Sequence, residues 1–380
     1  MATDFEAERL LEGLEGPART ARLELLERLE AEGVDPDELR AASAEGRLAL
    51  VPVERILVGD SNRYTAAQVA ERTDVDDELL ERYWRAIGMS TADPDDAVYL
   101  DDDIDAAERL VALREAGLGD DAIIEMARVM SSGMSTLAVT IAGVFAESYL
   151  REDDDEASLA MRYAEAAEKL LPLLGPALDH ALMVQNRSNL RQASAIGSSL
   201  SEGRLPDSRD VAVAFADLVD FTKLGESVDP GRLGAVATRL EELTRDAINR
   251  PVRLVKTIGD EVMLESSDTV ALLDSALELL DAADGEDDGF PQIAVGIARG
   301  EAISRGGDLF GHSVNLASRL TSAARPGSIL VTEEAKDAAG EDGYTYSFAG
   351  ERKLKGVHGP QKLFRARRRE GDAPEKNESD

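Results

Sequence analysis

The 380-residue chain has no cysteine, only three histidines and no long uninterrupted run of apolar residues. The lack of cysteine excludes disulfide bridges, thiolate metal sites and a cysteine nucleophile. The most apolar stretch, residues 137–145, is short and interrupted by glycine and threonine, so we expect no helix that crosses a bilayer. The first residues, Met-Ala-Thr-Asp-Phe-Glu, are acidic and unlike a signal peptide. These features predict a cytoplasmic protein that is not integral to a membrane.

Positive charge is scarce as well. Lys and Arg number 42 against 76 Asp and Glu, which gives a formal net charge of −34. A field of this sign repels nucleic acids and anionic lipid surfaces, so we expect no nucleic acid partner. The cluster Arg365–Arg369 is an exception, because it is locally basic in a chain of net negative charge. We interpret it as a solvated end that precedes a disordered tail, residues 369–380.

The first half, residues 1–180, predicts an all-helical domain. Apolar residues recur at spacings of three and four between Phe5 and Glu32, as in an amphipathic helix. Thr65 and Asp76 are expected to cap two further helices, and this pair resembles the helix-turn-helix of MerR-type regulators. A DNA-binding version would have a basic second helix. Here that helix begins with the acidic run 74–78, so we interpret the pair as a packing module.

The segment from Glu125 to Phe145 combines small residues with several methionines. This composition suits a helical core or a dimer seam, because small side chains allow close helix packing and methionine adapts to irregular surfaces. A pocket for a lipid or fatty acid is the alternative. An acidic run, 153–156, precedes two more expected helices, 157–174 and 176–200. We expect residues 181–206 to form a coupling helix and linker to the second half.

The second half, residues 207–368, predicts an α/β sandwich, which makes the whole chain α+β. Residues 231–248 carry apolar side chains at helical spacing and are expected to pack on a sheet. The expected strands lie near 210–217, 252–256, 261–265, 292–298 and 328–332, and the expected helices near 230–249, 268–283 and 313–324.

Two acidic residues follow strands in this half. The segment 211–222 reads as a buried strand that runs into a turn, with Asp217 at its end. The segment 253–264 reads as a β-hairpin with Gly259 and Asp260 at its turn. Carboxylates at two strand–turn junctions can hold Mg²⁺ or Mn²⁺, which prefer oxygen ligands.

A third segment, 306–320, places an acid, an amide and a guanidinium at spacings of seven and four. If a helix begins near residue 313, Asn315 and Arg319 lie one turn apart on one face, and Asp308 lies in the strand or turn before it. An acid can accept from an adenine amino group, an amide can hold a ribose, and arginine can neutralise a phosphate. Together they predict a site that binds a nucleoside triphosphate along its length.

These three motifs, in this order, resemble those of the class III nucleotidyl cyclases, the adenylyl and guanylyl cyclase family. The resemblance covers roughly residues 205–368, and the two-part layout is similar to that of soluble actinobacterial cyclases with a helical regulatory half. It implies a ferredoxin-like catalytic domain and a homodimer whose active sites form between two such domains. One domain would supply the metal-binding aspartates and the other the base-selecting pair, the asparagine and the arginine. A monomer would be inactive.

Carried over by position, Asp217 and Asp260 are the metal-binding aspartates, which would hold two Mg²⁺ or Mn²⁺ ions per active site. Lys256 and Asp308 are the base-selecting pair. Asp308 can accept from the adenine amino group and Lys256 can donate to N1, whereas guanine reverses both polarities. The pair therefore favours ATP.

The remaining roles also come from the resemblance. Asn315 would orient the ribose and Arg319 would stabilise the transition state, while Phe221, Thr222 and Lys355 would bind the substrate, the lysine at the triphosphate. The implied reaction is attack of the ribose 3′-oxygen on the α-phosphorus, which gives cyclic AMP and pyrophosphate. The resemblance also implies regulation by the helical half through autoinhibition.

One departure, one similarity to another family and one alternative function accompany this interpretation. Asp220 occupies a position where the family normally has glycine, and its carboxylate either repels polyphosphate, adds a metal ligand or turns to solvent. Residues 306–310 resemble the GGDEF signature of diguanylate cyclases, but Leu309 stands where those enzymes need an acid. The alternative function is a catalytically weak sensor of a lipid or of pH on a cyclase scaffold.

Overall fold

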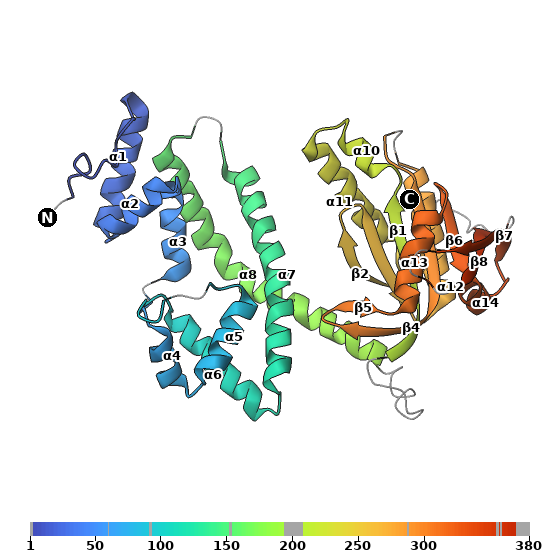
Figure 1. Ribbon diagram of the computed structural model, residues 1–380. Helices are drawn as coiled ribbons and strands as arrows, with labels where there is room; N and C mark the ends of the chain where they lie inside the picture. Colours follow the sequence, from blue (N-terminus) through green and yellow to red (C-terminus); the bar gives the residue numbers. More distant parts are fainter. Residues whose placement is uncertain are drawn as a thin grey trace, which may run out of the picture. The chain divides into compact units, whose positions relative to one another are not determined.

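The computed structural model describes residues 3–59, 61–90, 93–151, 154–193, 208–286, 289–354, 357 and 359–369. The chain divides into two compact units, Met1–Asn186 and Arg187–Asp380. Figure 1 draws both, and each is described on its own. Of the expected disordered tail, only Arg369 lies within the described residues.

The first unit is helical in its described part, apart from one isolated β-bridge between Tyr64 and Tyr99. This confirms the expected all-helical first half. Its elements are α1 (Gly16–Ala31), α2 (Pro36–Ala44), the 3₁₀ turn η1 (Leu48–Leu50), α3 (Val51–Val58), α4 (Ala66–Thr73), α5 (Asp77–Ile87), α6 (Asp101–Glu115), α7 (Asp120–Tyr149) and α8 (Glu156–Ala193).

The helix starts show where local sequence signals decide the structure. Thr65 accepts from the backbone N–H of Gln68 in a capping box, and Asp76 accepts from that of Leu79, so both predicted caps are confirmed. The expected helix from Phe5 is wrong, because residues 5–13 form turns and α1 begins only at Gly16. Gly13 and Gly16 have positive φ values, which a continuing α-helix does not allow.

α8 also corrects an expectation. Two helices were predicted, with a break before Pro176, but one 38-residue helix runs through both Pro172 and Pro176. Each proline removes a single N–H donor, and the leucine- and alanine-rich flanks favour helix strongly enough to continue it. α8 includes residues 181–193 of the expected coupling segment; the rest of that segment lies outside the described residues.

Two hydrophobic clusters hold the first unit together. One gathers Leu25, Leu26 and Leu29 of α1 with residues of α2 and α3, and Ala160 of α8 joins it. The other packs α4, α5, α6 and the start of α7, with Trp84 stacked on Tyr99 at 3.9 Å between ring centroids. Beyond these clusters, most side chains of α7 are exposed or only partly buried.

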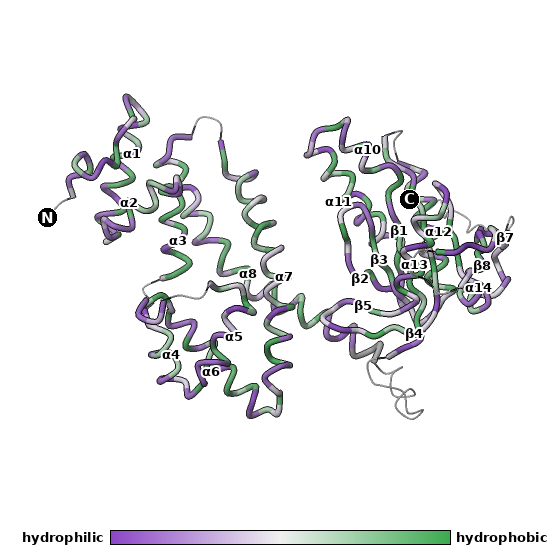
Figure 2. The backbone as a smooth tube through the Cα atoms, in the orientation of Figure 1, coloured by the Kyte–Doolittle hydropathy of each residue, from purple (hydrophilic) through white to green (hydrophobic). Residues whose placement is uncertain are grey.

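Only Ile123, Ile124 and Ala127 of α7 are buried. Its exposed large apolar side chains are Met126, Val129, Met130, Met134, Val139 and Val144, and those of α8 are Leu173, Leu178, Leu182, Met183 and Val184. Figure 2 shows hydrophobic residues along α7. The helix has 30 residues and is long and apolar enough, by length and composition, to cross a membrane, although its most apolar stretch, residues 137–145, is too short to do so alone. Within a single chain, then, this segment is not the helical core that was one of its two expected roles.

The second unit is a mixed sheet with helices on both faces. Its elements are β1 (Ser208–Leu218), α10 (Phe221–Gly225), α11 (Pro230–Ala247), β2 (Arg253–Ile258), β3 (Glu261–Ser266), α12 (Thr269–Asp284), β4 (Ile293–Arg305), β5 (Asp308–Phe310), α13 (His312–Ala323), β6 (Ser328–Thr332), α14 (Glu333–Ala339), β7 (Tyr344–Lys353) and β8 (Pro360–Arg368). The strand order is β2-β3-β1-β4-β6-β8-β7, with β5 paired to β4.

The first four main strands form the expected ferredoxin-like unit. β2, β3, β1 and β4 pair antiparallel in that order, and α11 and α12 supply the two crossovers of a βαββαβ chain. β6 adds parallel to β4, and the β7–β8 hairpin extends that edge. The five predicted strands are all present, whereas β5, β7 and β8 were not predicted.

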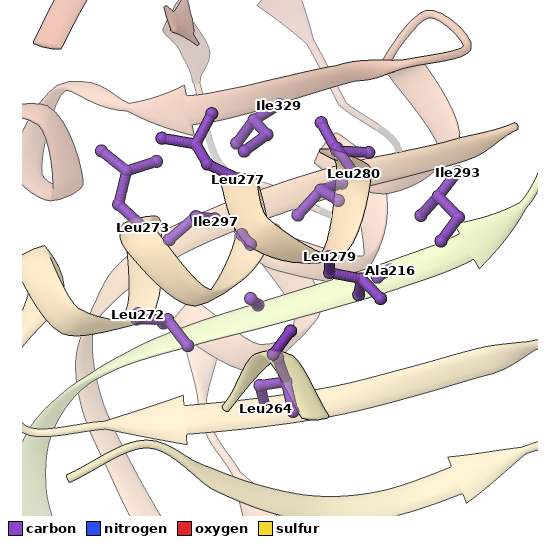
Figure 3. Close-up of a cluster of buried hydrophobic side chains, with 14 of the residues drawn as sticks. Ala216, Leu264, Leu272, Leu273, Leu277, Leu279, Leu280, Ile293, Ile297 and Ile329 are labelled. Carbon is purple, nitrogen blue, oxygen red and sulfur yellow. The ribbon is translucent and has the colours of Figure 1, made fainter. Parts of the chain in front are cut away.

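Alternation along β1 assigns the two faces of the sheet. Ala212, Ala214 and Ala216 belong to the core beneath α12, while Val213 and Phe215 belong to the core beneath α13. Asp217 continues the second series, so it lies on the α13 face. Figure 3 shows the α12 side of the core, where Leu272, Leu273, Leu277, Leu279 and Leu280 meet Ala216, Leu264, Ile293, Ile297 and Ile329.

Candidate active site

Asp217 and Asp260 come together at one edge of the sheet. Asp217 is the penultimate residue of β1, and Gly259 with Asp260 forms the two-residue turn between β2 and β3. Gly259 has a φ of 62°, which glycine adopts at little cost. The backbone N–H of Leu218, the residue after Asp217, donates to the carbonyl of Asp260 at 3.1 Å. The two expected metal ligands are thus neighbours.

The carboxyl groups at this edge repel one another. Burial, followed by the charge of Asp260, raises the pKa of Asp217 to about 6. Glu261 pairs directly across the strands with Asp217, and burial and the two aspartates raise its pKa to about 7. Sequence reasoning missed Glu261, although its place beside Asp260 in the hairpin was a usable signal. The cluster favours a bound cation or retained protons.

The donor set suits Mg²⁺ or Mn²⁺. Carboxylate oxygens are the ligands that these hard ions prefer, and Mg²⁺ in nucleotide sites commonly takes one or two carboxylates, with water and substrate phosphates completing its shell. Within the described ranges, no group of three or more Asp, Glu or His side chains has the arrangement of a metal cage. Asp217 and Asp260 therefore fit an ion that is shared with a phosphate ligand.

Lys256 and Asp308 form a second pair. They are 52 residues apart, and the Lys256 ammonium donates to one carboxylate oxygen of Asp308. The other oxygen accepts from the backbone N–H of Leu309 at 2.8 Å, which orients the carboxylate. Both side chains are partly exposed. The structure brings the two residues together; their role as a donor and an acceptor for a base stays a prediction.

Asn315 and Arg319 lie one turn apart on the exposed face of α13, as expected. The opposite face, with Leu316, Ala317 and Leu320, is buried on the sheet. Neither the Asn315 amide nor the Arg319 guanidinium has a hydrogen-bond partner among the described residues. Both groups are available to a ligand or to another chain.

Two residues that hold α13 in place were missed by sequence reasoning. Gly296 of β4 lies so close to the helix that a Cβ atom there would be 2.3 Å from the backbone nitrogen of Thr321. Thr321 is buried, and its hydroxyl donates to the carbonyl of Phe215 at 3.1 Å. A glycine in the middle of a buried strand is a signal of close backbone approach.

The positions of the remaining expected ligand-binding residues say less about how they would bind a substrate. Phe221 and Thr222 begin α10; Phe221 packs against the α12-side core and Thr222 is exposed. Asp220 precedes them with a φ of 60°, and its exposed carboxylate accepts from the Lys223 ammonium at 2.6 Å. This favours the interpretation in which Asp220 turns to solvent. Lys355 lies outside the described residues.

Comparisons with known proteins address the whole chain. Residues 205–366 match the family model described as Adenylate and Guanylate cyclase catalytic domain, and residues 3–190 match Adenylate cyclase regulatory domain. Over 374 residues the chain is 40% identical to the pH-sensitive adenylate cyclase MT1302 of Mycobacterium tuberculosis, covering 97% of this chain and 93% of that one. The chain belongs to the adenylate cyclase family.

Other members of the adenylate cyclase family match as well. An adenylate cyclase of Streptomyces coelicolor is 36% identical over 305 residues, which cover 78% of this chain and 77% of the relative. The crystal structure of the adenylyl cyclase CyaB from P. aeruginosa aligns with 44% of this chain and 97% of its own, at 22% identity and a TM-score of 0.37.

The raised pKa values predict how this adenylate cyclase homologue responds to pH and metal. The folded chain binds the protons of Asp217 and Glu261 more tightly than the unfolded chain, so their contribution to stability is present at low pH and is lost as the pH rises through about 6 to 7. A cation must displace these protons at low pH but not at high pH. Added Mn²⁺ should therefore raise the Tm by a few degrees more at about pH 8 than at about pH 5.5.

Thermal unfolding of the full chain with and without Mn²⁺ measures this difference. Glu261→Gln is the matched variant, because it removes one titrating group next to the two aspartates, and it should reduce the dependence on pH. Equal stabilisation by Mn²⁺ at both pH values would contradict the prediction.

Proposed function

We propose that this protein is a cytoplasmic signalling enzyme, an adenylyl cyclase that converts ATP to 3′,5′-cyclic AMP and pyrophosphate. The observation that carries the proposal is the contact of Lys256 with Asp308, which presents a donor and an acceptor with the polarity of the adenine edge. Guanine would face a donor with a donor and an acceptor with an acceptor. Unpaired polar groups in a desolvated pocket cost a few kcal/mol, enough to choose between the bases.

The chemistry follows from the positions of the other side chains. Asp217 and Asp260 would hold two Mg²⁺ or Mn²⁺ ions, whose chemistry when bound would be to neutralise phosphate charge and make the ribose 3′-hydroxyl more acidic. Asn315 holds the ribose, and Arg319 donates to the charge that develops on the phosphate. Phe221, Thr222 and Lys355 bind the substrate, with Lys355 at the triphosphate. The protein contributes positioning and charge neutralisation rather than a covalent nucleophile.

The active enzyme is a homodimer with two equivalent sites. In each site one chain supplies Asp217 and Asp260, and the other supplies Lys256, Asp308 and the α13 residues. The exposure of Asn315 and Arg319, and their lack of partners among the described residues, support this arrangement. Two-fold symmetry then gives each chain one half of both sites.

Large apolar side chains are exposed on more than one side of α7, and they support a dimer seam in the regulatory unit. Val139 is 71% exposed, and the neighbouring large apolar residues of α7 are exposed with it. A second copy of this chain is a better occupant than a bilayer for two reasons. The net charge of −34 repels anionic lipids, and acidic residues flank the apolar segment on both sides. The lipid pocket considered for this segment stays a prediction.

The helical unit regulates the catalytic unit by autoinhibition, with residues 181–206 as the coupling element. A relative over nearly the whole chain is named a pH-sensitive adenylate cyclase, which supports pH as a candidate stimulus. His180 of α8 and His312 next to the catalytic helix residues are both exposed.

Subunit mixing tests the shared site. Asp217→Ala and Arg319→Ala should each be inactive when pure, and their mixture should recover about one quarter of wild-type turnover, since half of the exchanged dimers then contain one intact site of two. Cyclic AMP formed from Mn²⁺–ATP is the measurement. A mixture of Asp217→Ala with Asp260→Ala is the control and should stay inactive, because both changes affect the same half. Inactivity of the first mixture under conditions of subunit exchange refutes the shared site.

A charge in the α7 face tests the seam. Val139→Glu should weaken dimerisation at least about tenfold, because an unpaired carboxylate is costly to bury between apolar surfaces. Leu57→Glu is the matched control: Leu57 is 62% exposed on α3, away from this face, and its replacement should leave the dimer intact. Sedimentation across a concentration series measures both. An unchanged dimer in Val139→Glu excludes the Val139 side of α7 from the seam.

Removal of the helical unit tests whether that unit inhibits the catalytic unit. If the helical unit inhibits, residues 201–380 should turn over ATP with a higher Vmax than the full chain, measured per dimer with both Mg²⁺ and Mn²⁺. Assays with GTP in parallel check the base preference. Identical turnover of the two proteins would leave no role for the first unit in controlling the second.

A further inference from the structure

A buried hydroxyl joins the helix that carries Arg319 to the strand that carries Asp217. Thr321 is 3% exposed, and its Oγ1 lies 3.1 Å from the carbonyl oxygen of Phe215 and 3.0 Å from that of Ala317. The hydroxyl has a single proton, which the two carbonyl oxygens share, and the Ala317 bond is the ordinary bond of a helical threonine to its own preceding turn. The Phe215 bond is different, since it crosses 106 residues to the middle of β1.

The bond lies close in the sequence to a residue from each half of the proposed site. Thr321 follows Arg319 by two residues on α13, and Phe215 precedes Asp217 by two residues on β1. The rest of the contact between α13 and the sheet is mainly apolar and close, with Gly296 leaving no room for a Cβ atom beneath Thr321. Apolar contact opposes separation of α13 from the sheet, but it does not fix the rotation of the helix or its position along its axis. A directional hydrogen bond fixes the rotation and axial position of the helix on β1.

We propose that Thr321 is a positioning residue that couples the two active sites of the dimer. The inference rests on the proposed function, in which Asp217 and Arg319 of one chain belong to different sites. A shift of β1 when a metal binds near Asp217 in one site is passed through the Phe215 carbonyl and Thr321 to Arg319 in the other site. Each chain thereby links the two sites through its own core.

The competing explanation is that Thr321 only fills space beneath α13. Thr321→Val distinguishes the two, because valine has nearly the same shape and lacks the hydroxyl. Thr321→Ser is the matched rescue variant, because it keeps the hydroxyl and loses a methyl group. Positioning predicts that Ser restores what Val loses, whereas space-filling predicts that Ser is at least as impaired as Val.

Hydrogen exchange of the full-length protein with Mn²⁺ alone gives a readout that does not depend on turnover. In the wild type and in Thr321→Ser, Mn²⁺ should slow the exchange of amides in both β1 and α13. In Thr321→Val the slowing should be confined to β1. The proposal is overturned if Mn²⁺ leaves α13 unaffected in the wild type, or protects it equally in the valine variant.

Steady-state kinetics provide the second readout. Thr321→Val should lower kcat about tenfold and change the KM for ATP less than about twofold, since a misplaced Arg319 weakens transition-state contacts more than substrate binding. Thr321→Ser should stay within about twofold of the wild type. A valine variant with wild-type kcat overturns the proposal. A wild type that forms no cyclic AMP contradicts the proposed function instead, and the exchange experiment still decides the role of Thr321.

Heterodimers with a single intact site separate coupling from local positioning. Such dimers form from Asp217→Ala and Arg319→Ala chains, and Thr321→Val can be added to either chain. In the chain that supplies Arg319 it should lower turnover under both explanations. In the chain that supplies Asp217, Thr321→Val should lower turnover only if Thr321 also affects the position of β1. No effect in that second case overturns the coupling between sites.

Discussion

The repulsion between carboxyl groups at the end of β1 is the constraint on which the catalytic unit depends. Asp217, Asp260 and Glu261 are brought together by the antiparallel pairing of β1 with β3 and by the bond from Leu218 to the Asp260 carbonyl. The backbone is fully paired there, so the sheet keeps the carboxyl groups close despite their charge. Either a divalent cation or retained protons would relieve that repulsion.

Both units expose surfaces that a single chain does not complete. In the catalytic unit, Asn315 and Arg319 face outward without partners among the described residues. In the regulatory unit, α7 exposes several large apolar side chains. One surface is polar and the other apolar, and in the proposed homodimer a second copy of the chain would cover both. Under that proposal, dimerisation and catalysis are a single requirement rather than two separate properties.

Local signals in the sequence were enough to predict much of this structure. The hairpin at Gly259 and Asp260, the caps at Thr65 and Asp76, and the position of Asn315 and Arg319 depend on neighbouring residues and were correctly predicted. The pairing of Lys256 with Asp308 came from a resemblance rather than from spacing, because no local rule connects residues 52 positions apart.

What the sequence did not disclose depends on contacts between distant segments. The bond from Thr321 to Phe215 and the close approach at Gly296 exist only once α13 lies across β4 and β1. The exposure of α7 was equally hidden, since an apolar helix has the same composition whether its partner is in its own chain or in another. The continuity of α8 through two prolines reflects the helical preference of their neighbours over a local breaking signal.

Those two prolines have a mechanical consequence. Pro172 and Pro176 are four residues apart, so they lie on the same side of α8, and each leaves a backbone carbonyl one turn earlier without its usual donor. The two missing hydrogen bonds therefore weaken the same side of the helix, and α8 bends more easily about one axis than about any other. Forces that act on α8 from different directions would therefore bend it mainly in one plane.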